Sequence, residues 1–173
     1  MIQPSVAGIA LLLAFGRRGL LGPVLNVLGV EVAFTTLAVV LAQTFVASPF
    51  YIKAAVIAFS GVDVDLRQAA ALDGASSWQV FRSITVPLTW TGLVSGMVMS
   101  WARAMGEFGA TILFAGNLPG VTQTMPLAIY LGFETNLDIA VTLSVILLFL
   151  SFTALLLAKA LLNRAAAYGS PIH

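Results

Sequence analysis

Cysteine is absent from this 173-residue chain, and charged residues make up only 9% of it. Without cysteine the chain cannot form disulfides, thiolate nucleophiles or cysteine metal sites. Its one histidine, His173, lies at the tail, where we expect a solvated end with no catalytic or metal-binding role. Soluble domains carry about 25% charged residues. The low charge and the 60% hydrophobic content therefore predict an integral membrane protein.

Basic blocks are also missing. The net charge is +1, which gives no reason to expect a nucleic-acid partner. The opening Met1-Ile2-Gln3-Pro4 has no basic region before its apolar run, so we expect no removable targeting segment. A phosphate-binding loop of the pattern Gly-x-x-x-x-Gly-Lys-Ser/Thr is not found either, so we do not expect the chain to hydrolyse ATP.

Long apolar runs predict the membrane helices. A crossing needs roughly 20 apolar residues, and the clearest candidate covers residues 139–158. A second span is expected over about 87–115 and a third over about 32–59, with Pro49 kinking or interrupting the third. Residues 6–15 are helical in pattern but too short to span. They form either an interfacial or re-entrant piece or the end of a membrane helix whose start is missing, and we favour the second.

Charge placement predicts the orientation, because cytoplasmic flanks are enriched in lysine and arginine. The C-terminus is expected in the cytoplasm, and acidic residues are expected outside. Arg17 and Arg18, in the glycine-rich loop expected over residues 16–23, would then lie outside and disagree with the rule. The residues assigned to the cytoplasmic side are Lys53, Arg67, Arg82, Lys159 and Arg164; those assigned outside are Glu31, Glu134 and Asp138.

A polar stretch, residues 68–87, separates two of the predicted spans. We expect Asp65 to cap a first short helix and Gly74 to follow its end in the left-handed region. Ser76 and Gln79 form a capping-box pattern that opens a second short helix, and Pro87 should close the element and start the next span. Local chemistry alone leaves open an ordinary cytoplasmic hairpin loop.

The spacing within this stretch resembles a signature of the type I permease subunits of ABC importers. That pattern is Glu-Ala-Ala, three residues, Gly, nine residues, then Ile-x-Leu-Pro. The matching residues here are Gln68, Ala69, Ala70, Gly74, Ile84, Val86 and Pro87. Gln68 departs from the family's acid, which would turn a charge-assisted bond to a partner arginine into a weaker neutral one.

The resemblance implies an all-α membrane fold: one type-1 transmembrane domain over 1–173, with about three full spans and a partial N-terminal helix. It implies a cytoplasmic coupling element at 63–86 that docks on a separate ATPase, which would bind the ATP. The family's molybdate members carry further helices before the part matching Pro4, so this chain is expected to be incomplete at its N-terminus. The residues expected to couple to the ATPase are Arg67, Gln68, Ala69, Ala70, Asp73, Gly74, Ala75, Phe81 and Pro87.

A second resemblance concerns the transported ion. "RAMGEFGATILFAGNLPGVTQTMPLAIY" (103–130) and "VLAQTFVASPFYIKAA" (40–55) are similar to the oxyanion permeases, most of all to the molybdate permease. This implies a permease for molybdate or tungstate in the cell membrane. Its expected partners are a second permease copy, ATPase subunits and an extracytoplasmic binding protein. A sulfate or thiosulfate permease and a non-functional truncated permease are the alternatives.

Two groups of residues are candidates for transport. Arg103 and Glu107, one helical turn apart inside a span, either shape a gate or form a local ion pair that fixes helix packing. Gly92 and Gly96 fit close helix packing, across a dimer or within the chain. The loop 116–126 is either a binding-protein contact or a connector. The full candidate sets are Arg103, Gly106, Glu107, Gly109 and Thr111 for the gate, and Arg17, Arg18, Asn117, Gly120, Thr122 and Thr124 for the binding protein.

Two other classes of membrane protein are alternatives to an importer subunit. A membrane-embedded enzyme would need a nucleophile, a base or metal ligands, and the lack of cysteine and of an inner histidine argues against it. An ATP-independent carrier would need no docking element, and copurification without any ATPase would favour it.

Overall fold

A computed structural model describes residues 3–168, and side-chain burial over residues 3–160. All regular structure in this range is helical, which confirms the all-α prediction. The chain divides into two compact units, one built from Met1–Ser48 with Ala102–Thr153, the other from Pro49–Trp101 with the chain from Ala154 onward. The elements are α1 (Pro4–Phe15), α2 (Gly22–Val27), α3 (Thr36–Ser60), α4 (Val64–Leu72), α5 (Ser77–Val80), the π-helical turn η1 (Phe81–Thr85), α6 (Val86–Met105), α7 (Gly109–Phe114), α8 (Met125–Thr135) and α9 (Leu137–Tyr168).

Two of these helices are long and apolar enough to cross a membrane. They are α3 and the Leu137–Ala160 part of α9, with mean hydropathies of 1.5 and 2.6. Only 11% and 6% of their apolar windows are buried within the chain, so most of each surface is available to lipid or to other helices. The helix predicted over 139–158 is present within α9 and is long and apolar enough to span. The predicted start at Val32 is wrong, because α3 begins at Thr36.

The predicted span over 87–115 is not one helix. Its first part, α6, has 20 residues but is not among the described helices apolar enough to count as a span. Helical structure then stops over residues 106–108 and resumes in α7. The break has a local cause, since the Glu107 carboxylate accepts the Ala110 backbone N–H at 2.8 Å and starts a new helix there.

Pro49 lies inside α3 without ending it. A proline has no N–H to donate, so the carbonyl of Phe45, four residues earlier, loses its helical partner. The Ser48 hydroxyl donates to that carbonyl at 3.1 Å. Serine side chains can satisfy carbonyls freed by proline in membrane helices. The expected interruption is therefore absent, although the two compact units do meet at this position in the sequence.

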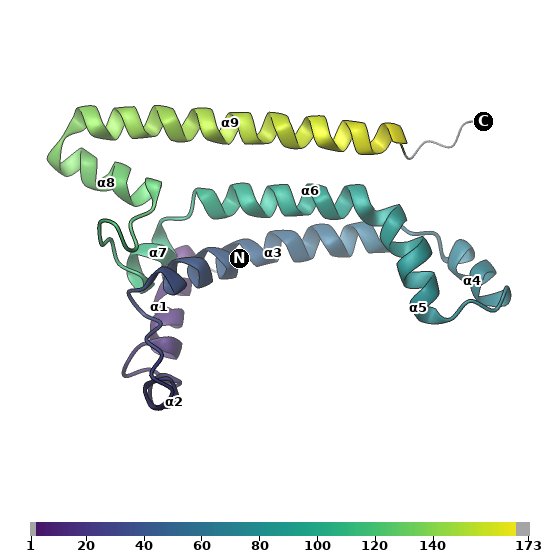
Figure 1. Cartoon of the computed structure of the whole chain (residues 1–173), viewed down its shortest axis with the longest axis horizontal. Helices are drawn as coiled ribbons and strands as arrows, with labels where there is room; N and C mark the ends of the chain where they lie inside the picture. Colours follow the sequence, from purple (N-terminus) through teal and green to yellow (C-terminus); the bar gives the residue numbers. More distant parts are fainter. Residues whose placement is uncertain (1–2, 169–173) are drawn as a thin grey trace. The chain divides into compact units, whose positions relative to one another are not determined.

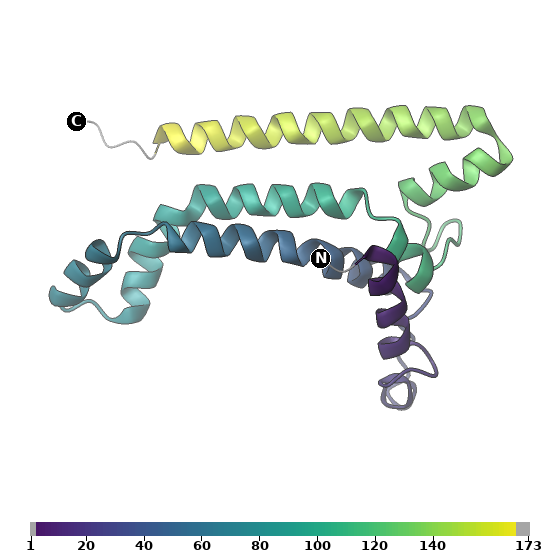
Figure 2. The same cartoon turned by 180° about the vertical axis from the view of Figure 1, so that it is seen from behind.

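In the first unit, α1 packs against α7 (Figure 2). A Cβ on Gly8 would lie 2.8 Å from the Ala110 backbone, so only glycine permits this approach. Leu11 and Phe114 belong to the buried cluster around the contact. The segment 16–21 is a turn as predicted, but Gly22 and Pro23 begin α2 rather than extend the loop. Proline suits this first turn because its missing N–H is not needed there.

In the second unit, the latter part of α3 lies beside α6 (Figure 1). Cβ atoms added to Gly92 and Gly96 would stand 2.7 Å from the Ala58 Cβ and 2.6 Å from the Ala54 Cβ. The two glycines therefore allow close packing within the chain. The sequence alone leaves open whether they pack within the chain or across a dimer. Small residues let helix backbones come close, and the gain is van der Waals contact.

Candidate functional site

The candidate coupling element is a helical hairpin that follows the end of α3 (Figure 1). Its first helix, α4, is capped by Asp63, whose carboxylate accepts the Asp65 N–H at 2.9 Å. The predicted cap at Asp65 is therefore wrong by two residues; Asp65 lies in the first turn, where its charge suits the helix N-terminus. Val62, directly before the cap, is buried.

The turn between α4 and α5 is formed by the residues that the sequence indicated. Gly74 has a φ of +88°, a left-handed conformation in which a side chain would be strained. The capping box is also confirmed. The Ser76 N–H donates to Gln79 Oε1 at 2.8 Å, and the Gln79 N–H donates to Ser76 Oγ at 3.4 Å. The turn therefore has a defined shape before any partner binds.

The sequence predicts that the element closes at Pro87, and this prediction is wrong. α5 continues through η1 into α6, and Figure 1 shows a bend where they join. The Val86 N–H donates to the Phe81 carbonyl, five residues back. Pro87 cannot donate to the carbonyl four residues before it, and π-helical turns occur where the regular ladder is interrupted. Thr85 and Thr89 are buried on this stretch. A continuous helix thus joins the turn to α6.

The outer surface of the element carries most of the predicted coupling residues. Gln68, Ala69, Asp73 and Gly74 are exposed, and α4 buries none of its residues. Large apolar side chains stand out on the same element, with Leu72 88% and Trp78 67% exposed. Exposed apolar and aromatic groups of this kind mark interaction surfaces. The element presents a ready contact face of small, apolar and polar groups.

A hollow of about 420 Å³ lies on the inner side of the element. Phe81 helps to line it and contacts two other rings, Trp78 at 5.8 Å and Phe59 at 6.2 Å between centroids. Arg67 also lines it, and its Nε is buried without a hydrogen-bond partner among the described residues. The sequence named Arg67 and Phe81 but gave no sign of Phe59, which comes from α3. The full lining is Phe59, Arg67, Ala71, Ala75, Ser77, Val80, Phe81 and Thr85.

The gate candidates gather at the break between α6 and α7. Arg103 Nη2 and Glu107 Oε2 form an ion pair at 2.8 Å. The Glu107 side chain is 1% exposed and that of Arg103 28%. The local ion pair considered from the sequence is therefore present, but Glu107 lies beyond the end of α6 and also caps the start of α7 through Ala110. One carboxylate holds both sides of the break.

The remaining gate candidates differ in environment. Gly106 is exposed, and a Cβ there would meet nothing within 4 Å. Gly109 faces α1, where a Cβ would lie 3.2 Å from Ser5 Oγ. Thr111 is fully buried, and its hydroxyl has no partner among the described residues. The structure thus brings Glu107, Gly109 and Thr111 into the packed part of the break and leaves Gly106 outside it.

The binding-protein candidates in the loop after α7 fall into two sets. Thr122 is buried and its Oγ1 accepts the Leu118 N–H at 3.0 Å, so it shapes the loop from within. Asn117 donates inward to the Leu127 carbonyl at 3.3 Å, and the hydroxyl of Thr124 is buried as well. Gly120, with a φ of +76°, lies at the exposed tip. Of these four candidates, only Gly120 is exposed to a partner.

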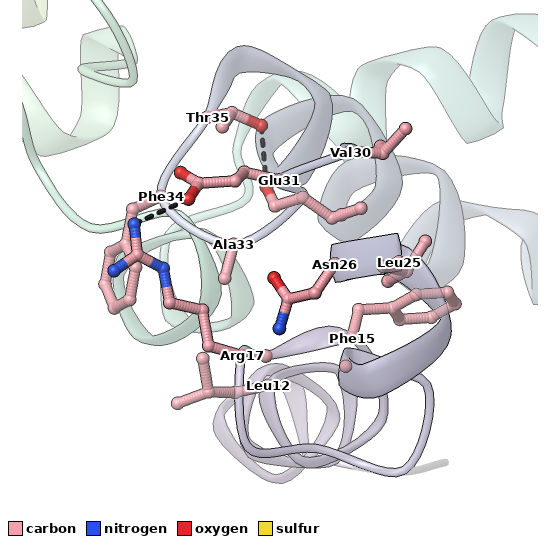
Figure 3. A pocket seen from close by; sticks show the side chains of 13 residues that line it. Leu12, Phe15, Arg17, Leu25, Asn26, Val30, Glu31, Ala33, Phe34 and Thr35 are labelled. Carbon is pink, nitrogen blue, oxygen red and sulfur yellow. Dashed lines mark hydrogen bonds and ion pairs between the residues drawn. The ribbon is translucent and has the colours of Figure 1, made fainter. Parts of the chain in front are cut away.

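The other two binding-protein candidates follow α1. Arg17 forms an ion pair with Glu31 at 2.7 Å, and both side chains are more than half exposed. The pair lies at a hollow of about 390 Å³, and Figure 3 shows Asn26 and Phe15 among the side chains around it. Arg18 is exposed. Phe34, unnoticed in the sequence, takes a φ of +61° here and its ring contacts Gly116.

One ionisable group in α8 has a shifted pKa. Glu134, one turn further along, accepts a hydrogen bond from the Tyr130 phenol and adds its negative charge, and both effects raise the pKa of Tyr130. The phenol therefore stays protonated. Its ring lies 5.3 Å from that of Phe108, between centroids, which links α8 to the segment of the α6–α7 break.

Comparison with known proteins places these features in context. The family described as "Binding-protein-dependent transport system inner membrane component" matches residues 1–166. The chain is 48% identical over 147 residues to the "Molybdenum transport system permease protein ModB" of Mycobacterium tuberculosis, covering 85% of this chain and 56% of that relative. It is 44% identical over 136 residues to the protein of the same name from Escherichia coli, covering 78% and 59%.

A relative named for another ion also matches. The "Probable sulfate transport system permease protein cysT" of Chlorella vulgaris is 36% identical over 158 residues, covering 90% of this chain and 59% of that relative. In each of these three comparisons the chain spans a little over half the length of the relative.

Proposed function

Since the chain belongs to the binding-protein-dependent transport system inner membrane component family, we propose that it is the membrane permease subunit of an ATP-driven molybdate or tungstate importer. The coupling hairpin carries this proposal. Its Gly74 turn and its capped helix α5 are built locally, and α5 runs on through η1 into α6. A push on the hairpin is therefore transmitted along a continuous helix toward the membrane. An ordinary polar loop would not need that connection.

The hairpin is assigned to the cytoplasm and the C-terminus to the same side. Asp138 lies at the start of the apolar part of α9 and Lys159 at its end, which agrees with the enrichment of basic residues at cytoplasmic flanks. In this arrangement the loop with Gly120 at its tip faces the binding protein. The gate is assigned to the Arg103–Glu107 break, where a buried carboxylate joins two helices.

The proposed assembly contains a second permease copy, two cytoplasmic ATPase subunits and an extracytoplasmic binding protein. Nucleotide would be bound by the ATPase, and this chain would hold no cofactor or metal of its own. The exposed coupling residues and the apolar Leu72 and Trp78 support a protein partner at the hairpin. Alternating inward and outward openings would then carry the anion.

Molybdate is proposed over sulfate because the two relatives described above that are named for molybdenum transport are 44% and 48% identical to this chain, whereas the sulfate-named relative is 36% identical. A sulfate or thiosulfate permease is the second candidate, because that weaker match covers 90% of this chain. Both candidates would have the same fold and the same kinds of partner, an ATPase and a binding protein, and they differ in which tetrahedral oxyanion is carried.

The test is uptake into proteoliposomes that hold the chain, its cognate ATPase subunits and its binding protein. We expect ATP-dependent uptake of radiolabelled molybdate that unlabelled tungstate suppresses more strongly than sulfate does. In Gly74→Asp, a charged side chain at a φ of +88° should abolish uptake and ATPase association together. Uptake that continues without ATP would establish an ATP-independent carrier, and stronger suppression by sulfate would establish the second candidate.

A further inference from the structure

Arg67 is the one predicted coupling residue with a buried polar side-chain atom that has no hydrogen-bond partner among the described residues. Its Nε has no exposed surface and no hydrogen-bond partner among the described residues, and the residue helps to line a hollow of about 420 Å³. A buried donor without an acceptor is destabilising and needs an explanation in a native structure. The hollow is lined mainly by apolar groups such as Phe59, Val80 and Phe81, so little else in it competes for the guanidinium.

No described acid neutralises this guanidinium. Asp63 is engaged as the cap of α4, and the ion pairs of the described residues join Arg17 to Glu31 and Arg103 to Glu107. Gln68, the next residue along α4, is exposed and uncharged. The positive charge available to a partner at this part of α4 is therefore that of Arg67.

We propose that the hollow receives an aspartate or glutamate side chain of the ATPase subunit, which pairs with the Arg67 guanidinium. The inference rests on the function proposed above and adds the chemistry of its contact. The two Nη groups of arginine form a planar fork that binds both oxygens of a carboxylate, so the pairing does not require access to the buried Nε. In the family pattern an acid at position 68 would bond an arginine of the partner. Here the charge-assisted bond would instead join Arg67 of the permease to an acid of the ATPase.

The charge of the hairpin argues against an anionic membrane surface as the occupant of the hollow. Between Asp63 and Pro87 the sequence has three aspartates against two arginines. Segments that bind anionic membrane surfaces instead carry clusters of several basic residues. The exposed Leu72 and Trp78 on the same hairpin add apolar contact surface, and a partly buried arginine beside such groups is typical of the residues that dominate protein–protein binding.

The test measures binding of the cognate ATPase to the full chain in nanodiscs of zwitterionic phosphatidylcholine, which has no net charge, and again with anionic phosphatidylglycerol added. Arg67→Gln should weaken binding about 10- to 100-fold, the range for losing a hydrogen-bonded charge. Arg82→Gln removes the same charge from an exposed site on η1 and should change binding less than about threefold. Arg67→Lys should restore only part of the affinity, because lysine lacks the fork.

A second arm identifies the acid. Each surface aspartate or glutamate of the ATPase is changed to arginine and paired with Arg67→Glu, and one pair should regain binding that both single variants lose.

Equal binding by Arg67→Gln and the unaltered chain would overturn the inference, as would equal losses of binding in Arg67→Gln and Arg82→Gln. A loss seen only with phosphatidylglycerol would assign the hollow to lipid phosphate. A lower melting temperature of Arg67→Gln without ATPase, with no loss of affinity, would assign Arg67 a structural role. Absence of ATPase binding by the unaltered chain would instead refute the proposed function.

Discussion

The contact between α3 and α6 makes the sharpest prediction about the fold. A Cβ on Gly96 would lie 2.6 Å from the Ala54 Cβ, about 1 Å closer than an ordinary carbon–carbon contact. Gly96→Ala should therefore force the helices apart, and overpacking of this kind is destabilising by about 1–3 kcal/mol. The added methyl also favours the helix by about 1 kcal/mol, so the single variant alone does not isolate the clash.

A double-mutant cycle removes this ambiguity. Ala54→Gly takes away the methyl that Gly96→Ala would strike, so the combined variant exchanges the two residues and relieves the overlap. Helix propensities cancel in the cycle, and the coupling free energy should be about 1–3 kcal/mol in favour of the exchanged pair. The assay is reversible unfolding in mixed micelles followed by far-ultraviolet circular dichroism.

The matched control pairs Ala54→Gly with Gly106→Ala. A Cβ on Gly106 meets nothing within 4 Å, so that cycle should be additive within about 0.5 kcal/mol. Coupling below about 0.5 kcal/mol for the Gly96 pair would refute the proposed packing. So would equal coupling for the control, because it would mean that the cycle reports a global change.

Three further predictions concern local bonds. Glu107→Ala should lower the unfolding free energy by about 3 kcal/mol, because Arg103 loses its buried partner. The double variant Arg103→Gln with Glu107→Gln should recover most of the lost free energy. Preserved transport in this double variant would contradict a gating role for the pair. Ser48→Ala should destabilise by about 0.6 kcal/mol in micelles, since the Phe45 carbonyl loses its donor; an unchanged value would mean that another group satisfies it. Ser76→Ala should be destabilising by about 1 kcal/mol and speed amide exchange at the start of α5; unchanged exchange would contradict the cap.

Features decided within a few residues could be predicted from the sequence. The left-handed glycine at position 74 and the capping box between Ser76 and Gln79 both follow from local backbone chemistry, and both are present. The cap of α4 was missed because Asp63 and Asp65 offer the same carboxylate two residues apart. The structure uses Asp63 as the cap, and the neighbouring Val62 is buried, which depends on packing. The local sequence therefore limits the cap to one of two aspartates but does not show which of them is used.

Features that depend on distant residues could not be predicted. The residues 87–115 read as one apolar run, and although the bonds of Glu107 at the break are local, its burial depends on packing that the sequence does not show. Gly92 and Gly96 indicated close packing, but the sequence did not name α3 as the partner helix. The hollow at Arg67 likewise needs Phe59, from the end of α3, beside residues of α5 and η1.

The most direct test of the coupling role is a cross-link between the hairpin and the ATPase. The chain has no cysteine, so Leu72→Cys provides a single thiol on an 88% exposed site of the hairpin. Phe149→Cys, 69% exposed in the middle of α9, is the matched control. With a short thiol-to-amine cross-linker in the assembled complex, Leu72→Cys should join the chain to the ATPase in a nucleotide-dependent yield, and Phe149→Cys should not. Equal yields from the two sites, or a cross-link from Phe149→Cys alone, would contradict the coupling role of the hairpin.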